Sequence, residues 1–335
     1  MLLILITGLG SMGKRRIRNL QHISSHKIIG FDTRKDRREE TTKKYNIETF
    51  DDIRAALKRK PDLMIISTPP DLHYKYAIIA IKNNIHFFTE LNMFSKDNEK
   101  LIRALHGKRT MGLPSCTLRF HPVIKKVKQL LENNTIGNVL LVHQHIGQYL
   151  PNWHPWEDYR KFFVSKKETG GARELLPFEL FWMTYLFSDI KSVYSNIGKV
   201  SKLDANIDDF YQILLEFKNN LFCTLNIDVV SIPSFRETKI IGEKGTIFCD
   251  FINGVIKINK GKQWRILKLK MGTIAKGYVG STPPETLYED EMRTVLNAII
   301  KKEKYPYSLN DELKILKIMD SIEHSDKMAK KIILN

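Results

Sequence analysis

The segment Leu-Leu-Ile-Leu-Ile-Thr-Gly-Leu-Gly-Ser-Met-Gly at residues 2–13 decides the fold of the N-terminal half. A short continuous apolar run that ends in glycines is typical of a strand buried on both faces of a parallel sheet. The spacing predicts a tight turn at Gly8, close approach of the backbone to a pyrophosphate at Gly10, and close helix–strand packing at Gly13. The helix that begins here would present its free N–H groups to that anion.

A second predicted strand, residues 27–31, follows the helix and ends at Asp32. In dinucleotide-binding folds an acid about 20 residues after the last glycine accepts hydrogen bonds from the adenosine ribose. We favour NAD over NADP because a carboxylate repels a 2′-phosphate, although four basic residues between positions 34 and 38 could bind that phosphate. The predicted cofactor residues in this region are Gly8, Leu9, Gly10, Ser11, Met12, Gly13, Asp32, Thr33 and Arg34.

Alternating strands and helices continue to about residue 120. Residues 62–66 are a buried strand closed by Ser67-Thr-Pro-Pro70, and residues 85–88 are a strand followed by Thr89-Glu-Leu-Asn92. Ligands of open α/β sheets bind beyond the carboxyl ends of the strands, and both turns stand at such ends. The first 120 residues therefore predict a doubly wound parallel sheet with a ligand at this edge.

The chain of 335 residues has 42% hydrophobic residues, which supports roughly two packed domains. The net charge of +17 invites a nucleic-acid hypothesis. Basic residues are mixed with acidic ones, however, and most of the surplus lies in the half with the phosphate-binding signals, so we expect no nucleic-acid partner. No apolar run approaches the roughly 20 residues of a membrane span. Three distant cysteines without CxxC spacing suit the reducing cytoplasm.

These features resemble the glucose–fructose oxidoreductase/inositol dehydrogenase/MocA (Gfo/Idh/MocA) family. The residues that carry the resemblance are the glycine loop, Asp32, Ser67-Thr-Pro-Pro70 with His73, Glu90, Arg119-Phe120, Gly170-Gly171 and residues 241–247. The resemblance implies an α/β protein: a Rossmann domain, residues 1–120, and an α/β domain, residues 121–335, whose open, mostly antiparallel sheet mediates homo-oligomers. The C-terminal helix could pack back on the first domain.

The same resemblance implies hydride transfer between NAD(P) and a sugar, a sugar nucleotide or a related polyol, in surface-carbohydrate precursor metabolism. Glu90 would contact the nicotinamide-side ribose. The further cofactor residues that it implies are Ser67, Thr68, Pro69, His73 and Asn92.

The sequence departs from the family pattern at two places. The family turn usually reads Glu-Lys-Pro, in which the lysine contacts the reacting hydroxyl and the cofactor, whereas this chain has Leu91 at that position. After the glycine pair the family commonly has an Asp, a His and an Asp, which align here with Glu174, Phe178 and Phe181. Only Glu174 is ionisable, so the usual acid–base groups cannot be carried over.

Two segments supply replacements. Residues 140–149 alternate like a strand, which places His143 and His145 on one face, and residues 150–160 are rich in the aromatic and charged side chains that bind sugars. Histidines on a strand are often structural, and the aromatic run could be an interdomain or oligomer contact. The candidate acid–base groups are His145, which we favour, Glu174, Tyr149 and His154. The candidate substrate residues are Arg119, His121, Trp153, Trp156, Glu157, Arg160 and Arg173.

No cluster of ligand side chains accompanies the two histidines, so we expect no metal. Residues 272–284 contain glycines and prolines, and we expect a mobile loop near the substrate. Because leucine replaces the family's lysine at position 91, two alternatives to net redox turnover stay open. One is a dinucleotide- and sugar-binding protein with a regulatory role, and the other is NAD-assisted elimination or hydrolysis.

Overall fold

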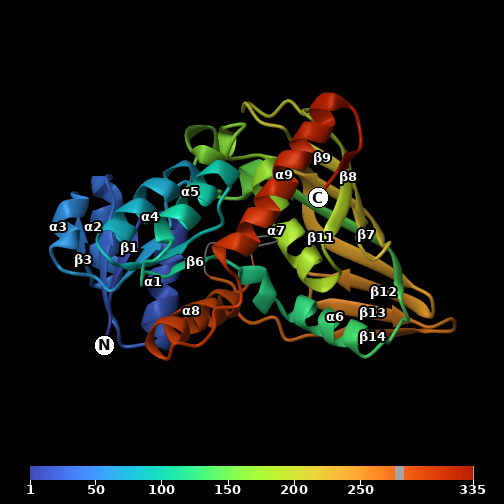
Figure 1. Cartoon of the computed structure of the whole chain (residues 1–335), viewed down its shortest axis with the longest axis horizontal. Helices are drawn as coiled ribbons and strands as arrows, with labels where there is room; N and C mark the ends of the chain where they lie inside the picture. Colours follow the sequence, from blue (N-terminus) through green and yellow to red (C-terminus); the bar gives the residue numbers. More distant parts are fainter. Residues whose placement is uncertain (276–282, 335) are drawn as a thin grey trace. The chain divides into compact units, whose positions relative to one another are not determined.

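The computed structural model describes residues 1–275 and 283–334, so residues 276–282 of the predicted loop lie outside the described residues. The chain divides into two compact units (Figure 1). One comprises Met1–Thr117 and Thr286–Leu316, and the other comprises Leu118–Glu285 and Lys317–Asn335. The C-terminal residues 286–316 therefore belong with the N-terminal unit.

The first unit is built on a six-stranded parallel sheet in the order β3-β2-β1-β4-β5-β6. Its strands are β1 (Leu3–Thr7), β2 (Lys27–Phe31), β3 (Glu48–Phe50), β4 (Leu63–Ile66), β5 (His86–Thr89) and β6 (Gly112–Pro114). The strand order reverses between β1 and β4, and Rossmann folds bind dinucleotides at this point. The predicted doubly wound parallel sheet is confirmed.

Helices cover both faces of this sheet. They are α1 (Ser11–Ile23), α2 (Lys35–Tyr45), α3 (Ile53–Leu57), α4 (His73–Lys82), α5 (Ser95–Leu105), α8 (Glu285–Ile300) and the first part of α9 (Leu309–Met328). Ile4 and Ile6 enter one core cluster with Met292 of α8, whereas Leu5 enters another with Leu309 of α9. Since successive residues of a strand point to opposite faces, β1 contributes to a core on each side.

The second unit contains a nine-stranded sheet in the order β14-β13-β12-β11-β7-β10-β9-β8-β15. Its strands are β7 (Val139–Tyr149), β8 (Ile190–Gly198), β9 (Phe210–Phe217), β10 (Phe222–Asp228), β11 (Val230–Gly242), β12 (Gly245–Asp250), β13 (Val255–Asn259), β14 (Trp264–Lys268) and β15 (Ile332–Ile333). Among the described strands of this second sheet, only β7 and β10 pair in parallel, so the expected mostly antiparallel sheet is confirmed.

Helix α7 (Ala172–Leu186) covers one face of this sheet, and α6 (Pro122–Glu132) also belongs to the second unit. Gln144 of β7 donates a hydrogen bond from Nε2 to Glu179 Oε2 of α7 at 2.8 Å. The same Glu179 pairs with Arg236 of β11 at 2.6 Å. The side chains of Gln144 and Arg236 therefore face α7, and their strand neighbours face away from it.

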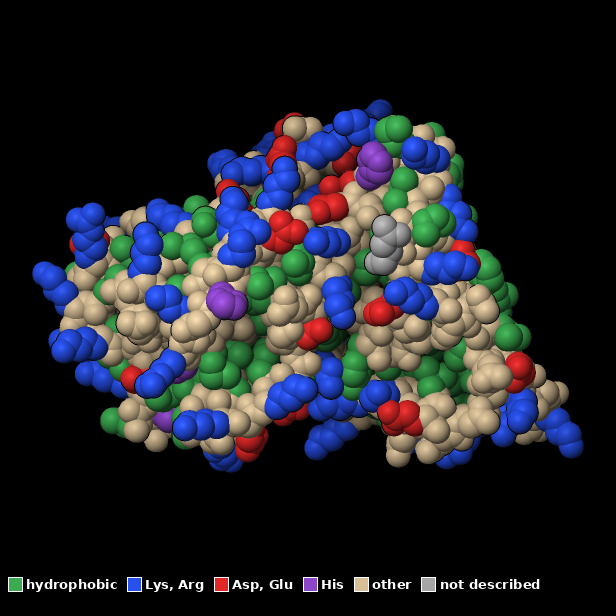
Figure 2. All heavy atoms as spheres, viewed as in Figure 1, with side chains coloured by type: hydrophobic (Ala, Val, Ile, Leu, Met, Phe, Trp, Pro, Cys, Tyr) green, Lys and Arg blue, Asp and Glu red, His purple; other side chains and the backbone are tan. Residues whose placement is uncertain are grey.

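The charged side chains do not gather by sign on the face that Figure 2 shows, where Lys and Arg are interspersed with Asp and Glu. Within residues 1–275 and 283–334, each helix is too short or too polar to cross a bilayer. No group of three or more His, Cys, Asp or Glu side chains among those residues could hold a metal ion.

Candidate active site

The glycine loop after β1 has the backbone that its sequence predicts. Gly8 has a φ of 91°, and a Cβ atom on Gly13 would lie 1.8 Å from the Gly8 carbonyl oxygen. Only glycine fits either position. Helix α1 begins directly after Gly10, which has no side chain to cap it. The first turn of α1 is therefore suited to an anion.

Asp32 ends β2 beside this loop. One carboxylate oxygen accepts from the Leu9 N–H at 2.8 Å, and the other accepts from the Arg34 N–H at 2.9 Å. Arg37 Nη1 lies 3.8 Å from the same carboxylate and 3.3 Å from the position of a Cβ atom on Gly10. A negative and a positive charge thus lie together where the adenosine ribose binds in this fold. The other nearby basic residues have partners of their own. Arg34 contacts Asp36, and Lys35 contacts Glu39. Arg38 donates to the backbone carbonyls of Asp32 and Thr33.

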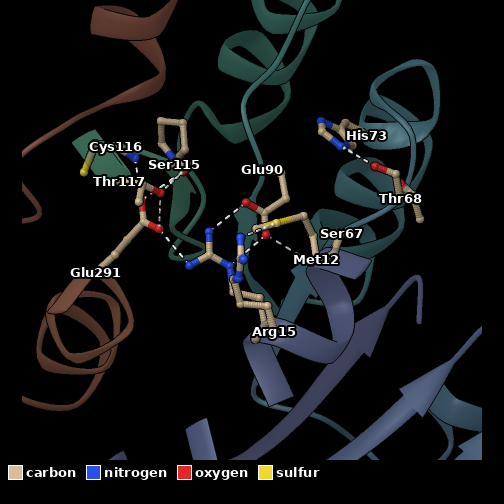
Figure 3. A network of polar contacts seen from close by, with 12 residues as sticks. Met12, Arg15, Ser67, Thr68, His73, Glu90, Ser115, Cys116, Thr117 and Glu291 are labelled. Atoms are coloured by element: carbon tan, nitrogen blue, oxygen red, sulfur yellow. Dashed lines mark hydrogen bonds and ion pairs between the residues drawn. The ribbon is translucent and has the colours of Figure 1, made fainter. Parts of the chain in front are cut away.

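Glu90, directly after β5, is held by three donors. Arg16 of α1 donates from Nε to Oε1 at 2.8 Å and from Nη2 to Oε2 at 2.7 Å. Ser67 Oγ donates to Oε1 at 3.1 Å, and Figure 3 shows Ser67 and Met12 beside Glu90. The Glu90 side chain is 16% exposed and the Arg16 side chain is fully buried. Glu90 is therefore a fixed carboxylate with one accessible edge.

Glu291 of α8 contacts the third nitrogen of the Arg16 guanidinium, Nη1, at 2.8 Å. Its carboxylate also accepts from Ser115 Oγ at 2.9 Å, from the Cys116 N–H at 2.6 Å and from Thr117 Oγ1 at 2.8 Å. Burial by itself lowers the pKa of Arg16, but the two carboxylates raise that pKa above its usual value. Arg16 is therefore a buried cation bound between two anions.

His73, at the start of α4, joins the turns after β4 and β5. Its Nε2 lies 2.9 Å from the Thr68 carbonyl oxygen and its Nδ1 lies 3.1 Å from Asn92 Oδ1. Asn92 Nδ2 donates to Glu312 Oε2 at 2.6 Å, and Asn98 Nδ2 donates to the same oxygen at 2.7 Å. Burial lowers the pKa of His73 and raises the pKa of Glu312 to about 7. This buried chain fixes both turns at one edge of the sheet.

The predicted cofactor residues therefore lie in four loops at the carboxyl ends of β1, β2, β4 and β5. A Cβ atom on Gly8 would lie 2.7 Å from the Ser67 carbonyl oxygen, so the loops after β1 and β4 are in contact. The remaining predicted residues lie at the same strand ends: Leu9 in the loop after β1, Ser11 and Met12 in the first turn of α1, Thr33 after β2, and Pro69 after β4.

Glu174 lies in the first turn of α7 in the second unit. Its Oε2 atom is buried and has no hydrogen-bond partner among the described residues. Burial raises the pKa of this carboxyl to about 8. The neighbouring Arg173 donates to Glu323 Oε1 at 2.5 Å and to the Glu168 carbonyl at 2.7 Å. Glu174 is thus largely a neutral acid near pH 7.

His143 and His145 share one face of β7, as the alternation predicts, but this face points away from α7. His145 Nε2 lies 2.9 Å from Asp228 Oδ2, and its ring meets Phe235 edge-on at 4.7 Å between centroids. His143 Nδ1 lies 2.8 Å from Thr224 Oγ1. The structure therefore does not bring His145 and Glu174 to the same side of the sheet. Tyr149 is the last residue of β7 and is partly buried.

The aromatic segment after β7 stacks on itself. His154 lies between Trp156 and Phe162, with centroids at 5.2 Å in both cases and the rings nearly parallel. Trp156 is 53% exposed, and Trp153 Nε1 is buried without a hydrogen-bond partner among the described residues. The charged residues of the segment contact near neighbours: Glu157 lies 3.8 Å from His154, and Arg160 forms two hydrogen bonds with Asp158.

Two other predicted substrate residues have contacts within the second unit. The Arg119 guanidinium lies over the Tyr185 ring of α7 at 4.1 Å. His121 is buried and accepts from the Val123 N–H as the N-cap of α6. Burial and the charge of Arg236 lower the pKa of His121 to about 3, so this imidazole is neutral. His121 has a structural role at this helix end.

Comparison with known proteins agrees with this geometry. Residues 2–106 match the model of the oxidoreductase family with an NAD-binding Rossmann fold, and residues 124–248 match the GFO/IDH/MocA C-terminal domain. The chain belongs to the Gfo/Idh/MocA oxidoreductase family.

Three curated relatives are similar to the chain at low identity. Oxidoreductase P35 of Formosa agariphila is 24% identical over 199 residues, which cover 58% of this chain and 61% of that protein. Glucose-6-phosphate 3-dehydrogenase of Bacillus subtilis is 21% identical over 241 residues, 68% of each chain. The 2,7-anhydro-N-acetylneuraminate hydratase of Escherichia coli is 24% identical over 197 residues, 56% of this chain and 51% of that protein.

Solved structures of low identity share the fold. An oxidoreductase of Agrobacterium radiobacter in complex with NAD⁺, L-tartaric acid and magnesium has a TM-score of 0.85 at 14% identity, covering 99% of this chain and 98% of the other. Levoglucosan dehydrogenase in complex with NADH and levoglucosan has a TM-score of 0.84 at 15% identity, covering 100% and 99%.

Within this Gfo/Idh/MocA chain, two residues of the site escaped the sequence reasoning. Arg16 lies in the helix after the glycine loop, and Glu291 lies in a helix near the C-terminus. A helical Arg three residues after the last glycine gives no local signal of its carboxylate partners. Leu91, at the vacant lysine position, is 9% exposed and supplies no polar group.

Proposed function

We propose that this chain is an NAD(H)-dependent oxidoreductase that transfers hydride at a sugar hydroxyl, with the first unit as the cofactor domain and the second as the substrate domain. The Glu174 carboxyl, whose Oε2 atom is buried without a hydrogen-bond partner among the described residues, carries the proposal. Its position on α7 aligns with the first ionisable residue of the family pattern, and it retains an ionisable group where the others are phenylalanine. A pKa near neutrality is what a general acid–base group needs.

Glu174 would act in both directions of the reaction. A bound nicotinamide cofactor would supply or accept the hydride. In reduction, the Glu174 carboxyl would donate its proton to the carbonyl oxygen of the substrate and end as the carboxylate. In oxidation, the Glu174 carboxylate would take the hydroxyl proton while the cofactor accepts the hydride. Because the carboxyl is largely protonated near pH 7, reduction is favoured there and oxidation rises with pH.

We propose NAD rather than NADP as the cofactor. The Asp32 carboxylate is fixed by two backbone N–H groups beside the glycine loop, and its charge would repel a 2′-phosphate. The nearby Arg37 guanidinium is the group that would attract one. Arg37 also lies beside Asp32, so its charge is partly offset in the absence of a ligand.

The substrate we propose is a sugar, a sugar phosphate or a sugar nucleotide. Trp156 presents an exposed ring backed by His154, and such a face suits stacking on the C–H groups of a sugar. Relatives of the chain are named for sugar substrates, glucose 6-phosphate in one case and levoglucosan in another. Arg119, Trp153, Trp156 and Glu157 remain the candidate substrate residues of the second unit.

We also propose that the chain forms homo-oligomers through the face of the nine-stranded sheet that points away from α7. Several exposed hydrophobic side chains lie on this face: Leu141, Leu214, Phe222, Trp264 and Ile266. Exposed apolar side chains on a sheet face are typical of an interface. The buried thiols Cys116, Cys223 and Cys249 support a reducing compartment, the cytoplasm.

A second candidate function is NAD-assisted elimination or hydration, in which NAD⁺ oxidises the substrate transiently and is regenerated. Leu91 favours it, because the usual lysine is absent, and one relative is named as a hydratase. Incubation with NAD⁺ and a panel of sugars and sugar phosphates separates the two functions. Net NADH absorbance supports the oxidoreductase, whereas product without net NADH supports the transient mechanism. Absence of NAD⁺ and NADP⁺ binding by calorimetry would contradict both.

A further inference from the structure

Arg16 occupies an unusual position for a charged residue. Its side chain is fully buried, and its guanidinium contacts Glu90 through two nitrogens and Glu291 through the third. A buried arginine is tolerated only where carboxylates satisfy it with good geometry. Here the two partners come from the loop after β5 and from α8, so one cation joins a cofactor loop to a C-terminal helix.

The hydrogen bonds to Glu90 leave one acceptor position of its carboxylate unfilled by the contacts described above. An ionised carboxylate has about four acceptor positions. Arg16 fills two of them and Ser67 Oγ fills a third. The side chain remains 16% exposed, and we assign the fourth position, on Oε2, to a ligand hydroxyl. Both oxygens are already tied to Arg16, so the carboxylate cannot rotate to offer another edge.

The anchor of Arg16 is itself rigid. Glu291 is fully buried, accepts from two hydroxyls and one backbone N–H of residues 115–117, and forms an ion pair with Arg16 at 2.8 Å. All four partners come from within the first unit. Position 91 is leucine, so no lysine stands beside Glu90 in the same turn, and Arg16 is the cation that the described residues place against it.

We infer that Arg16 is a positioning residue that acts through Glu90: it orients the carboxylate so that its remaining acceptor position meets a hydroxyl of the nicotinamide-side ribose, with Glu291 as the anchor. This inference rests on the proposed NAD(H) binding. It assigns Arg16 no contact with the cofactor. The arginine is needed for its two parallel donors, which a lysine cannot supply.

Three ligands locate the effect along the dinucleotide: ADP, which lacks the second ribose, ADP-ribose, which contains it, and NAD⁺. Calorimetry on the full-length wild type and Arg16→Lys gives the dissociation constants. Arg16→Lys should weaken ADP-ribose and NAD⁺ by about tenfold, the worth of one charged hydrogen bond, and leave ADP within about twofold. Equal weakening of all three ligands would mean general damage to the domain and would overturn the inference.

A double-mutant cycle tests whether Arg16 acts through Glu90. If it does, Arg16→Lys should change ADP-ribose affinity by less than about twofold in a Glu90→Gln background. Additive losses would overturn the inference. If Arg16→Lys fails to fold, Glu291→Gln is the second variant, because it disturbs the Glu90–Arg16–Glu291 contacts without altering Arg16. It should weaken the binding of ADP-ribose and NAD⁺ by a smaller factor and leave ADP binding unchanged. A wild-type protein that binds ADP-ribose but not NAD⁺ or NADP⁺ would contradict the proposed function. The double-mutant cycle of Arg16 and Glu90 could still be measured with ADP-ribose.

Discussion

The Asn92 side-chain amide donates to Glu312 at 2.6 Å, although 220 residues separate the two in sequence. Asn92 belongs to the loop after β5, which also carries Glu90, and Glu312 lies in the first turn of α9. Asn98 of α5 donates to the same oxygen, and the Asn92 N–H donates to the other. The loop after β5 is thus fixed by a buried carboxylate from the C-terminal region.

Removal of this carboxylate should destabilise the first unit. Glu312→Ala leaves the Asn92 and Asn98 amides buried without their acceptor, and we expect a loss of about 2–4 kcal/mol in the free energy of unfolding. Urea denaturation followed by circular dichroism measures it. Asp320→Ala, at an exposed position of the same helix, is the control and should change stability by less than about 0.5 kcal/mol. Equal effects of the two variants would show that the Glu312 contacts contribute little.

The cofactor preference should respond to one charge. Asp32→Ser removes the carboxylate that opposes a 2′-phosphate and leaves Arg37 in place, so NADP⁺ affinity should rise by about tenfold or more and NAD⁺ affinity should fall. Calorimetry with both cofactors measures the change. Arg37→Ala in the Asp32→Ser background should cancel the gain for NADP⁺. Unchanged NADP⁺ affinity in Asp32→Ser would show that Asp32 does not select the cofactor.

The stability of the protein should depend on the ionisation of Glu174. Its pKa in the folded chain is about 8, above the ordinary value of 4.5, so its contribution to stability is fully present below pH 4.5 and is lost as the pH rises through 8. Glu174→Gln keeps a neutral side chain of similar shape. Its stability relative to wild type should therefore rise between about pH 5 and about pH 9, by on the order of 2 kcal/mol.

Urea denaturation at both pH values measures this difference. Glu168→Gln, at an exposed position just before the glycine pair, is the matched control and should follow wild type at each pH. If Glu174→Gln and wild type lost stability in parallel as the pH rose, the carboxyl would have an ordinary pKa in the folded protein.

The outer face of the nine-stranded sheet should control the oligomeric state. Phe222→Glu places a charge among the exposed apolar side chains of this face and should shift the protein to monomers, as measured by light scattering after gel filtration. Met328→Glu introduces the same charge at an exposed methionine on α9 and should leave the mass unchanged. A wild type that is monomeric at all concentrations would contradict the proposed interface.

The parts of the fold that could be predicted from sequence are those that depend on local chemistry. The turn at Gly8 and the close packing at Gly13 exclude other residues for steric reasons, so the loop and its flanking strand and helix follow from spacing alone. The length of strand β11, Val230–Gly242, does not follow from local pattern. Pro233 and the nearby serines interrupt its apolar pattern, and its length comes from pairing with β7.

The parts of the site that sequence could not give depend on tertiary contacts. Alternation placed His143 and His145 on one face, but it could not say that Gln144, and not the histidines, points toward α7. Arg16 reads as one of many surface cations until Glu90 and Glu291 surround it. Glu174 was a candidate acid–base group only because of its position in the family pattern. That its Oε2 atom is buried without a hydrogen-bond partner among the described residues is visible only in the folded chain.

The most direct test of the proposed mechanism is the pH dependence of NAD⁺-linked sugar oxidation in wild type, Glu174→Gln and His145→Ala. We expect the wild-type rate to rise with an apparent pKa near 8. Glu174→Gln should lower turnover by about 100-fold or more and remove this rise, since the general base is lost, while His145→Ala should retain both. A Glu174→Gln variant with wild-type turnover and the same pH dependence would contradict the assignment of Glu174 as the acid–base residue.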